Sequence, residues 1–213
     1  MVEHEMTPLC ELARKYQTDK GGWHLQAGET CHNYTPFYYR FWKDRRLEVM
    51  NVLEIGVNYC CSLRMWEEFF PNAHIYGIDS NADCLQYNGP RIHVHMADQG
   101  SVESLHHALH EMKNPLFDFI VDDGSHETHH QILSCNCLMP SLKKDGLYVI
   151  EDIVLDCQPE SVGKFIHYPW IAVPTGHGLG KAHCWEACRK CHGKEGEQLI
   201  CVAHEGKPYL RSD

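Results

Sequence analysis

The sequence predicts an α/β fold in which helices cover both faces of a doubly wound, parallel sheet. From about residue 50, short apolar runs alternate with longer amphipathic stretches, which is typical of βαβ units. Acidic residues stand at the end of every run that we interpret as a core strand. This is expected where a ligand binds at the carboxyl ends of the strands of an open sheet.

Length and composition limit the function classes. The 213 residues, 43% hydrophobic and 23% charged, predict one globular domain. A formal net charge of −10 argues against a nucleic-acid partner. The chain shows neither an apolar run of the roughly 20 residues needed for a membrane span nor an export signal. We therefore expect a cytoplasmic protein whose twelve cysteines are reduced thiols.

The elements are expected in the following order. Residues 1–50 form a helical N-terminal extension, residues 51–153 the core, and residues 154–213 the last strands. Helices are expected over residues 62–70, 102–113 and 129–143, the last ending at Lys143 and Lys144 before a stop signal at Gly146. Strands are expected over residues 51–55, 74–78, 92–96, 117–121 and 147–150, with weaker candidates over 166–173 and 199–203.

The strand ends predict a cofactor site. A single glycine, Gly56, follows the first strand, where a dinucleotide would need a loop with three glycines. SAM (S-adenosylmethionine) carries no phosphate, so one close-approach glycine is enough. Asp79 stands about 20 residues beyond the glycine, as a ribose-binding acid does. We expect Asp98 and Gln99, at the end of the third strand, to face the adenine.

The segment Asp122-Asp123-Gly124-Ser125-His126 predicts a catalytic and metal-binding site. Two adjacent carboxylates raise each other's pKa unless a cation or hydrogen-bond donors neutralise them, and Glu151-Asp152 follows the next strand. Hard oxygen ligands suit Mg²⁺. An imidazole titrates near neutrality, so His126 is the candidate general base. The alternative is a helix N-cap at Ser125 or Asp123 with the other acids solvated.

Several segments together resemble the SAM-dependent O-methyltransferases that methylate deoxysugars, such as the macrolide sugar methyltransferases. The segments are LEIGV, SLRMWEEFFPNAHIYGIDSN, ADQGS, FDFIVDDGSHETHHQ and LKKDGLYVIEDI, with YQTDKGGWH and HNYTPFYYRFW upstream. The resemblance covers about residues 16–153. It implies a Rossmann-like, mainly parallel sheet of seven strands, dependence on Mg²⁺ and a histidine base.

The resemblance also implies site residues. His126 becomes the base beside Asp123, and the metal ligands become Asp123, Glu151 and Asp152. Lys20 and Tyr34 are expected to close over the methionine end of SAM. The remaining cofactor-binding candidates are Glu54, Gly56, Asn58, Asp79, Ser80, Asp98, Gln99 and Asp122.

The chain departs from the family pattern in two places. The loop Val57-Asn58-Tyr59-Cys60-Cys61 is poorer in glycine, and little after Cys157 matches. In that last third, Cys184, Cys188 and Cys191 with His192 or His183 suggest a zinc site. We interpret this tail as a reduced, cysteine-rich helix and loop because a paired second C-x-x-C motif is missing.

The predicted function is therefore Mg²⁺-assisted, SAM-dependent O-methylation of a sugar, for example a rhamnose in a glycan or glycoside. One alternative is a catechol-type methyltransferase, because vicinal phenol hydroxyls also chelate a metal. Another is a catalytically silent binding module with a zinc-bound tail. The start of the chain near the family's first motif also suggests a domain of a longer glycan-synthesis protein, an algal-virus protein for example, fused to or acting with glycosyltransferases.

Overall fold

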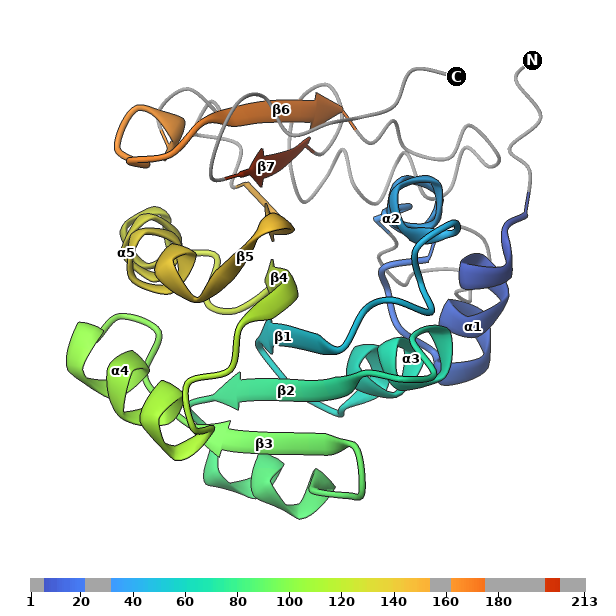
Figure 1. The fold of residues 1–213 in the computed structure, drawn as a ribbon, viewed down its shortest axis with the longest axis horizontal. Helices are drawn as coiled ribbons and strands as arrows, with labels where there is room; N and C mark the ends of the chain where they lie inside the picture. The colour runs from blue at the N-terminus through green and yellow to red at the C-terminus, as the bar shows by residue number, and fades with distance from the viewer. Residues whose placement is uncertain (1–5, 22–31, 154–161, 175–197, 204–213) are drawn as a thin grey trace, which may run out of the picture.

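A computed structural model describes residues 6–21, 32–153, 162–174 and 198–203 of the chain. Its strands form one seven-stranded sheet in the order β3-β2-β1-β4-β5-β7-β6 (Figure 1). The first five strands of that order run parallel, and β7 is antiparallel to both of its neighbours. The strands are β1 (Asn51–Ile55), β2 (His74–Asp79), β3 (Ile92–Met96), β4 (Phe117–Asp122), β5 (Leu142–Ile150), β6 (Trp170–Pro174) and β7 (Gln198–Val202).

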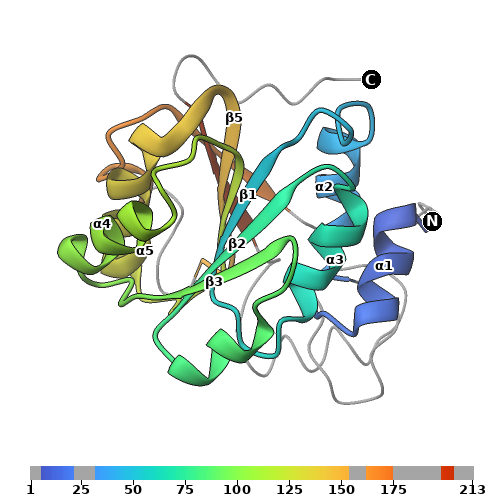
Figure 2. The ribbon, with the colours of Figure 1, turned by 60° about the horizontal axis from the view of Figure 1, so that its bottom comes forward.

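Helices cover both faces of this sheet (Figure 2). One face packs against α1 (Pro8–Tyr16), α2 (Thr35–Trp42) and α3 (Cys61–Phe69). The other packs against α4 (Val102–Glu111) and α5 (Thr128–Leu138). Two short 3₁₀ helices, η1 (Ala82–Tyr87) and η2 (Met139–Ser141), complete the described elements.

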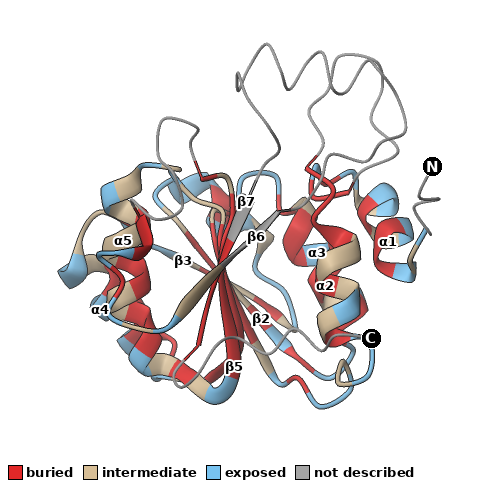
Figure 3. Cartoon of the chain, turned by 90° about the horizontal axis from the view of Figure 1, so that it is seen from above, coloured by how far each residue is buried: buried red, intermediate tan, exposed pale blue. Residues whose placement is uncertain are grey.

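Side chains that alternate along the central strands fill the two cores. Val52 and Val149 point to the α1–α3 side, whereas Leu53 and Ile150 point to the α4–α5 side, as the two-residue period of a strand requires. All four side chains are buried, and buried residues fill the sheet between the helix layers in Figure 3. The central strands are therefore covered on both faces, which is typical of parallel sheets.

The described part of the N-terminal extension belongs to the first of these cores. Tyr38 and Trp42 of α2 make edge or tilted ring contacts with Phe119 of β4, and Trp66 of α3 contacts the same ring. The three aromatic residues of the helices are fully buried. The extension is thus fixed against the centre of the sheet, next to β4, which ends at Asp122 and is followed by Asp123.

The structure corrects the predicted end of the last core helix. α5 ends at Leu138, and Leu142 already pairs with Phe117 in the sheet. Pro140 lacks a backbone N–H and cannot continue the α-helical hydrogen-bond pattern, so the chain turns through η2 instead. Lys143, Lys144 and Gly146 consequently lie inside β5, and the prediction of a stop at Gly146 was wrong.

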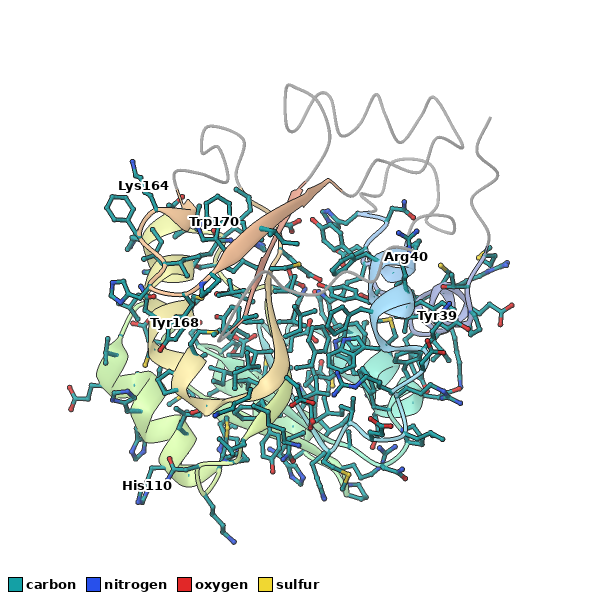
Figure 4. All side chains as sticks on the ribbon, turned by 45° about the horizontal axis from the view of Figure 1, so that its top comes forward. Tyr39, Arg40, His110, Lys164, Tyr168 and Trp170 are labelled. Carbon is teal, nitrogen blue, oxygen red and sulfur yellow. The ribbon has the colours of Figure 1, made fainter. Side chains whose placement is uncertain are left out.

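The last two strands were predicted approximately. β7 agrees with the expected strand to within one residue, whereas β6 begins four residues later than expected, at Trp170. Figure 4 places Tyr168 and Trp170 on the α5 side of the sheet, and Tyr39 and Arg40 on α2. None of the described helices has the length and apolar composition needed to cross a membrane. The cysteines of the suggested zinc site lie outside the described residues.

Candidate functional site

The carboxyl ends of β1, β4 and β5 meet at one edge of the sheet. The parallel register places Asp122 beside both Ile55 and Ile150. Backbone hydrogen bonds continue past the strand ends, from Asp123 N–H to the Ile55 carbonyl and from Glu151 N–H to the Asp122 carbonyl, each at 2.9 Å. The residues predicted to form the site are therefore held together by the sheet itself.

A cavity of about 1510 Å³ opens over these strand ends. Its walls come from the loops after β1, β2, β3 and β4, from the end of α1, and from Asp152 after β5. The predicted site residues that line it are Gly56, Asn58, Asp79, Ser80, Asp98, Gln99, Asp123, His126 and Asp152. A cavity of this size at the carboxyl edge of an open sheet is where such folds bind their ligands.

Gly56 is required where β1 turns into this cavity. Its φ is +94°, a region that residues with a Cβ rarely adopt. A Cβ at this position would lie 2.1 Å from the carbonyl oxygen of Asp123. The single glycine therefore serves a close approach between the β1 and β4 loops.

Asp79 stabilises the loop that follows Gly56. One of its oxygens accepts hydrogen bonds from the backbone N–H groups of Val57 (2.8 Å) and Asn58 (3.1 Å), and the other from that of Asn81 (2.8 Å). Burial would raise the pKa of this carboxyl, but the three backbone donors outweigh burial and lower it below its usual range. Asp79 thus stays ionised on the cavity wall while it shapes the glycine-poor loop.

Gln99 and Asp122 connect the ends of β3 and β4. The Gln99 amide donates to Asp122 (2.6 Å), and its oxygen accepts from the Ser125 backbone N–H (2.9 Å). Asp122 also accepts from the hydroxyls of Ser134 (2.6 Å) and Tyr148 (3.3 Å). Burial raises the Asp122 pKa to about 6 although these donors oppose the shift. Asp122 has no exposed surface.

Lys20 lies beneath the site in contact with three carboxylates. Its ammonium is 2.6 Å from Asp123 Oδ2 and 3.2 Å from Glu54 Oε1, and it donates a short hydrogen bond to Glu151 Oε2. The other oxygen of Glu151 accepts from the Tyr38 hydroxyl. Glu54 Oε2 accepts from Trp66 Nε1 at 2.7 Å.

Three buried or partly buried carboxyl groups face one lysine in this cluster. Burial raises the pKa values of Glu54, Asp123 and Glu151 despite the opposing charge of Lys20. Burial alone would lower the Lys20 pKa, but the three acids raise it well above its usual range. The lysine is therefore charged and balances only part of the carboxylate charge.

The structure brings one candidate cation-binding group together among the described residues. Ligand atoms of Asp123, His126 and Asp152 lie within 4.8 Å of one another. Nε2 of His126 is 3.9 Å from Asp152 Oδ2, and φ is +59° at His126 and +48° at Asp152. Such left-handed conformations cost energy in residues other than glycine and concentrate at functional sites. Two carboxylates beside an imidazole fit a hard divalent cation such as Mg²⁺, which takes oxygen ligands.

Four predicted cofactor residues and one predicted metal ligand are placed differently than expected. Lys20, Tyr34, Glu54 and Asp122 do not line the cavity, because each is at most 1% exposed. The ammonium of Lys20 contacts the carboxylates of Glu54, Asp123 and Glu151. Tyr34 donates its hydroxyl hydrogen bond to Asp152. Glu151 has both oxygens engaged by Lys20 and Tyr38 and is absent from the cation-binding group.

Several cavity residues were not predicted from the sequence. The end of α1 contributes Arg14, Gln17, Thr18 and Asp19, and the segment YQTDK was the available signal. His130, interpreted above as part of a helix, also lines the cavity. Its Nδ1 lies 2.8 Å from the Ser125 hydroxyl, and its ring packs so close to Gly100 that a Cβ there would lie 2.3 Å from Nε2.

Comparisons with known proteins identify the family of this chain. No protein-family model matches the chain. The mycinamicin VI 2''-O-methyltransferase of Micromonospora griseorubida is 38% identical over 152 residues, 68% of this chain and 36% of the relative. The 8-demethyl-8-alpha-L-rhamnosyl tetracenomycin-C 2'-O-methyltransferase of Streptomyces olivaceus is 34% identical over 164 residues, 74% of this chain and 40% of the relative.

Solved structures lead to the same group. A structure of the MycE methyltransferase in complex with Mg, SAH (S-adenosylhomocysteine) and mycinamycin VI is 27% identical, with a TM-score of 0.64 over 93% of this chain and 55% of that one. A caffeoyl-CoA O-methyltransferase structure from Staphylococcus aureus, 13% identical, shares the fold with a TM-score of 0.53. The chain spans less than half the length of the curated relatives named above. By sequence and by fold, the chain belongs to the class I, SAM-dependent sugar O-methyltransferase family.

Proposed function

We propose that this protein transfers a methyl group from SAM to a hydroxyl of a sugar, a deoxysugar such as rhamnose in a glycan or glycoside, with help from Mg²⁺. The observation that carries the proposal is the convergence of Asp123, His126 and Asp152 at one end of a large cavity. The relatives named for O-methylation of mycinamicin VI and of a rhamnosyl tetracenomycin support a sugar as the acceptor.

The cofactor would occupy the part of the cavity lined by the β1, β2 and β3 loops. Gly56, Asn58, Asp79, Ser80, Asp98 and Gln99 line that part and are the residues we assign to SAM binding. Gly56 adds no side chain to the cavity wall, and Asp79 and Asp98 offer acceptors for hydroxyl and amino groups. Both are partly engaged by backbone N–H groups, so their remaining lone pairs would serve the cofactor.

Asp123 and Asp152 are the proposed direct ligands of the metal. No described residue donates a hydrogen bond to Oδ1 of Asp123. Glu151 would have to lose its hydrogen bond with Lys20 or with Tyr38 in order to bind the metal. With both hydrogen bonds in place, it lies beneath the site and is not a ligand. When bound, the cation supplies positive charge that orients the acceptor hydroxyl and lowers its pKa.

His126 is the proposed general base. His126 lines the cavity, and Nε2 of its ring lies 3.9 Å from Asp152 Oδ2. The acceptor oxygen attacks the methyl carbon, the carbon–sulfur bond breaks and SAH leaves. The hydroxyl proton passes to His126. General-base catalysis of this kind is typically worth about 10²–10⁴-fold in rate.

One set of variants separates the role of a base from that of a metal ligand. We expect His126→Ala to lose turnover by about 10²–10⁴-fold and to keep its affinity for SAH and for Mg²⁺ in isothermal titration. Asp123→Asn is expected to weaken Mg²⁺ binding and to leave SAH binding intact. If His126→Ala loses Mg²⁺ binding as well, His126 is a ligand and not the base. A fully active His126→Ala enzyme removes the residue from both roles.

The choice of acceptor is tested with a panel of compounds. Rhamnose-type glycosides and catechols are each incubated with the protein, SAM and Mg²⁺, and the masses of the products are measured by mass spectrometry. Methylation of the glycosides alone supports the proposal, whereas methylation of the catechols alone replaces it. A protein that binds SAH and methylates neither class would be the silent binding module.

Two finer predictions accompany this function. We infer that the protein works in the cytoplasm, where SAM is made, and alongside glycosyltransferases that build the acceptor. Both inferences depend on the sugar substrate. Fractionation of expressing cells, followed by methylation assays on newly glycosylated acceptors, tests them together.

A further inference from the structure

Lys20 is placed in a way that is uncommon for a lysine. Its side chain is 1% exposed, and lysine is almost never fully buried unless it is paired. Its backbone is fixed as well, because the carbonyl of Lys20 accepts hydrogen bonds from the N–H groups of Tyr34 (2.8 Å) and Thr35 (3.2 Å) at the start of α2. The backbone of Lys20 is therefore fixed independently of the contacts that its ammonium makes with the carboxylates.

The ammonium joins three neighbouring strands of the sheet. Glu54 belongs to β1, Asp123 follows β4, and Glu151 follows β5. Lys20 makes an ion pair with Glu54 and hydrogen bonds with the other two. Glu54 is buried away from the cavity and is fixed by Trp66, so it acts as the anchor of the group.

Lys20 and Tyr38 together occupy three of the four carboxylate oxygens of Asp123 and Glu151. Lys20 occupies Oδ2 of Asp123 and Oε2 of Glu151, and Tyr38 occupies Oε1 of Glu151. Among the described residues, Oδ1 of Asp123 has no hydrogen-bond donor, whereas both oxygens of Glu151 accept a hydrogen bond. Oε1 of Glu54 also lacks a hydrogen bond, but it is buried and ion-paired with Lys20. Asp123 is also the one of the three that belongs to the cation-binding group with His126 and Asp152.

We propose that Lys20 is a positioning residue of the methyl-transfer site, which is anchored on Glu54 and orients Asp123 and Glu151 so that one oxygen of Asp123 faces the metal position. The inference rests on the proposed function, because it assumes that Asp123 binds the metal. Partners that orient metal ligands in this way typically change metal affinity by about 10–100-fold when they are removed.

A simpler role for Lys20 would be that of a counter-ion. The lysine would then only balance buried charge, and any change that restores the balance would restore the site. The two roles differ in one respect. Positioning needs the hydrogen bonds to Asp123 and Glu151, whereas a counter-ion needs only the net charge.

The test uses a charge-balanced double variant. Lys20→Met removes one positive charge, and Lys20→Met/Glu54→Gln also removes one negative charge, so the cluster regains its original net charge. The Gln side chain can still accept the hydrogen bond from Trp66. Lys15→Met is the matched control, because Lys15 forms an exposed ion pair with Glu68 and does not line the cavity.

Mg²⁺ and SAH affinities are measured by isothermal titration, and thermal unfolding is followed for each protein. We expect Lys20→Met to unfold at a lower temperature and the double variant to recover most of the loss. The double variant should still bind Mg²⁺ about 10–100-fold more weakly than the wild type. Its SAH affinity should be unchanged because Lys20 does not line the cavity. Lys15→Met should match the wild type throughout.

Wild-type Mg²⁺ affinity in the double variant would overturn positioning and leave the proposed function intact. A wild-type protein that binds SAH but no Mg²⁺ would overturn the metal-assisted function and this inference with it. If the double variant does not fold, Lys20→Arg decides, because it keeps the charge and changes the donor geometry. Positioning predicts about a tenfold or larger loss of Mg²⁺ affinity in that variant, and a counter-ion predicts none.

Discussion

Replacing Gly56 by alanine tests whether the close approach of the β1 and β4 loops builds the site. The new Cβ would lie 2.1 Å from the Asp123 carbonyl oxygen and 2.8 Å from its carbonyl carbon. A backbone group cannot swing aside as a flexible side chain can, so the β4 loop must move. A left-handed backbone costs about 1–2 kcal/mol in residues other than glycine, and forced overpacking costs about 1–3 kcal/mol more.

We therefore expect Gly56→Ala to lower the free energy of unfolding by about 2–5 kcal/mol. For a chain of this length the unfolding temperature should fall by about 4–20 °C. Gly89→Ala is the control, because a Cβ there meets no atom within 4 Å. It should stay within about 1 kcal/mol of the wild type.

Urea unfolding gives the free energies of both variants, and isothermal titration with Mg²⁺ reports on Asp123. Gly56→Ala should weaken Mg²⁺ binding as well, because the displaced carbonyl belongs to the residue we propose as a ligand. Equal stability and equal Mg²⁺ affinity in the two glycine variants would refute the reasoning.

Three further predictions concern the buried polar groups and the metal. In urea unfolding, Trp66→Phe should lower the free energy of unfolding by about 1–3 kcal/mol more than Trp42→Phe does. The reason is that Trp66 Nε1 donates a hydrogen bond to Glu54, whereas Trp42 Nε1 has no partner among the described residues. Equal losses in the two variants would contradict this. The Asp122 pKa of about 6 lies above the unfolded value, so protonation stabilises the fold as pH falls and the contribution is lost as pH rises through 6. The wild type should then gain about 1.4 kcal/mol over Asp122→Asn between pH 7.5 and pH 5, and a constant difference would show that Asp122 does not titrate there. Excess EDTA should abolish methyl transfer and added Mg²⁺ should restore it, whereas full activity in EDTA would exclude the metal.

The positions of the core strands along the chain, and the acidic residues at their ends, could be predicted because both are local in the sequence. Asp122 and Asp123 follow an uninterrupted buried strand, and a parallel register brings such ends to the same edge. The end of α5 was missed for a physical reason. Leu138 and Leu142 are four residues apart, as on one face of a helix, and the prediction did not weigh the missing N–H of Pro140, which lies between them.

The roles of the acidic residues could not be separated from the sequence. Apolar strands end at or just before three of these acids, Asp79, Asp122 and Glu151. Asp79 holds a loop, Asp122 is buried in a hydrogen-bond network, and Glu151 accepts hydrogen bonds from Lys20 and Tyr38. Such partners come from segments far apart in the chain, and Lys20 is 131 residues from Glu151. Hydrophobic periodicity carries no information about contacts of this kind.

The central claim is that these strand ends perform metal-assisted methyl transfer with His126 as the base. Mass spectrometry of a rhamnose-type glycoside incubated with SAM tests it most directly, with wild-type protein in Mg²⁺, wild-type protein in EDTA, and His126→Ala in Mg²⁺ run side by side. The account predicts that the glycoside gains the mass of one added methyl group in the first sample. Much less methylated product should form in the second and third samples. Equal methylation in all three would contradict it.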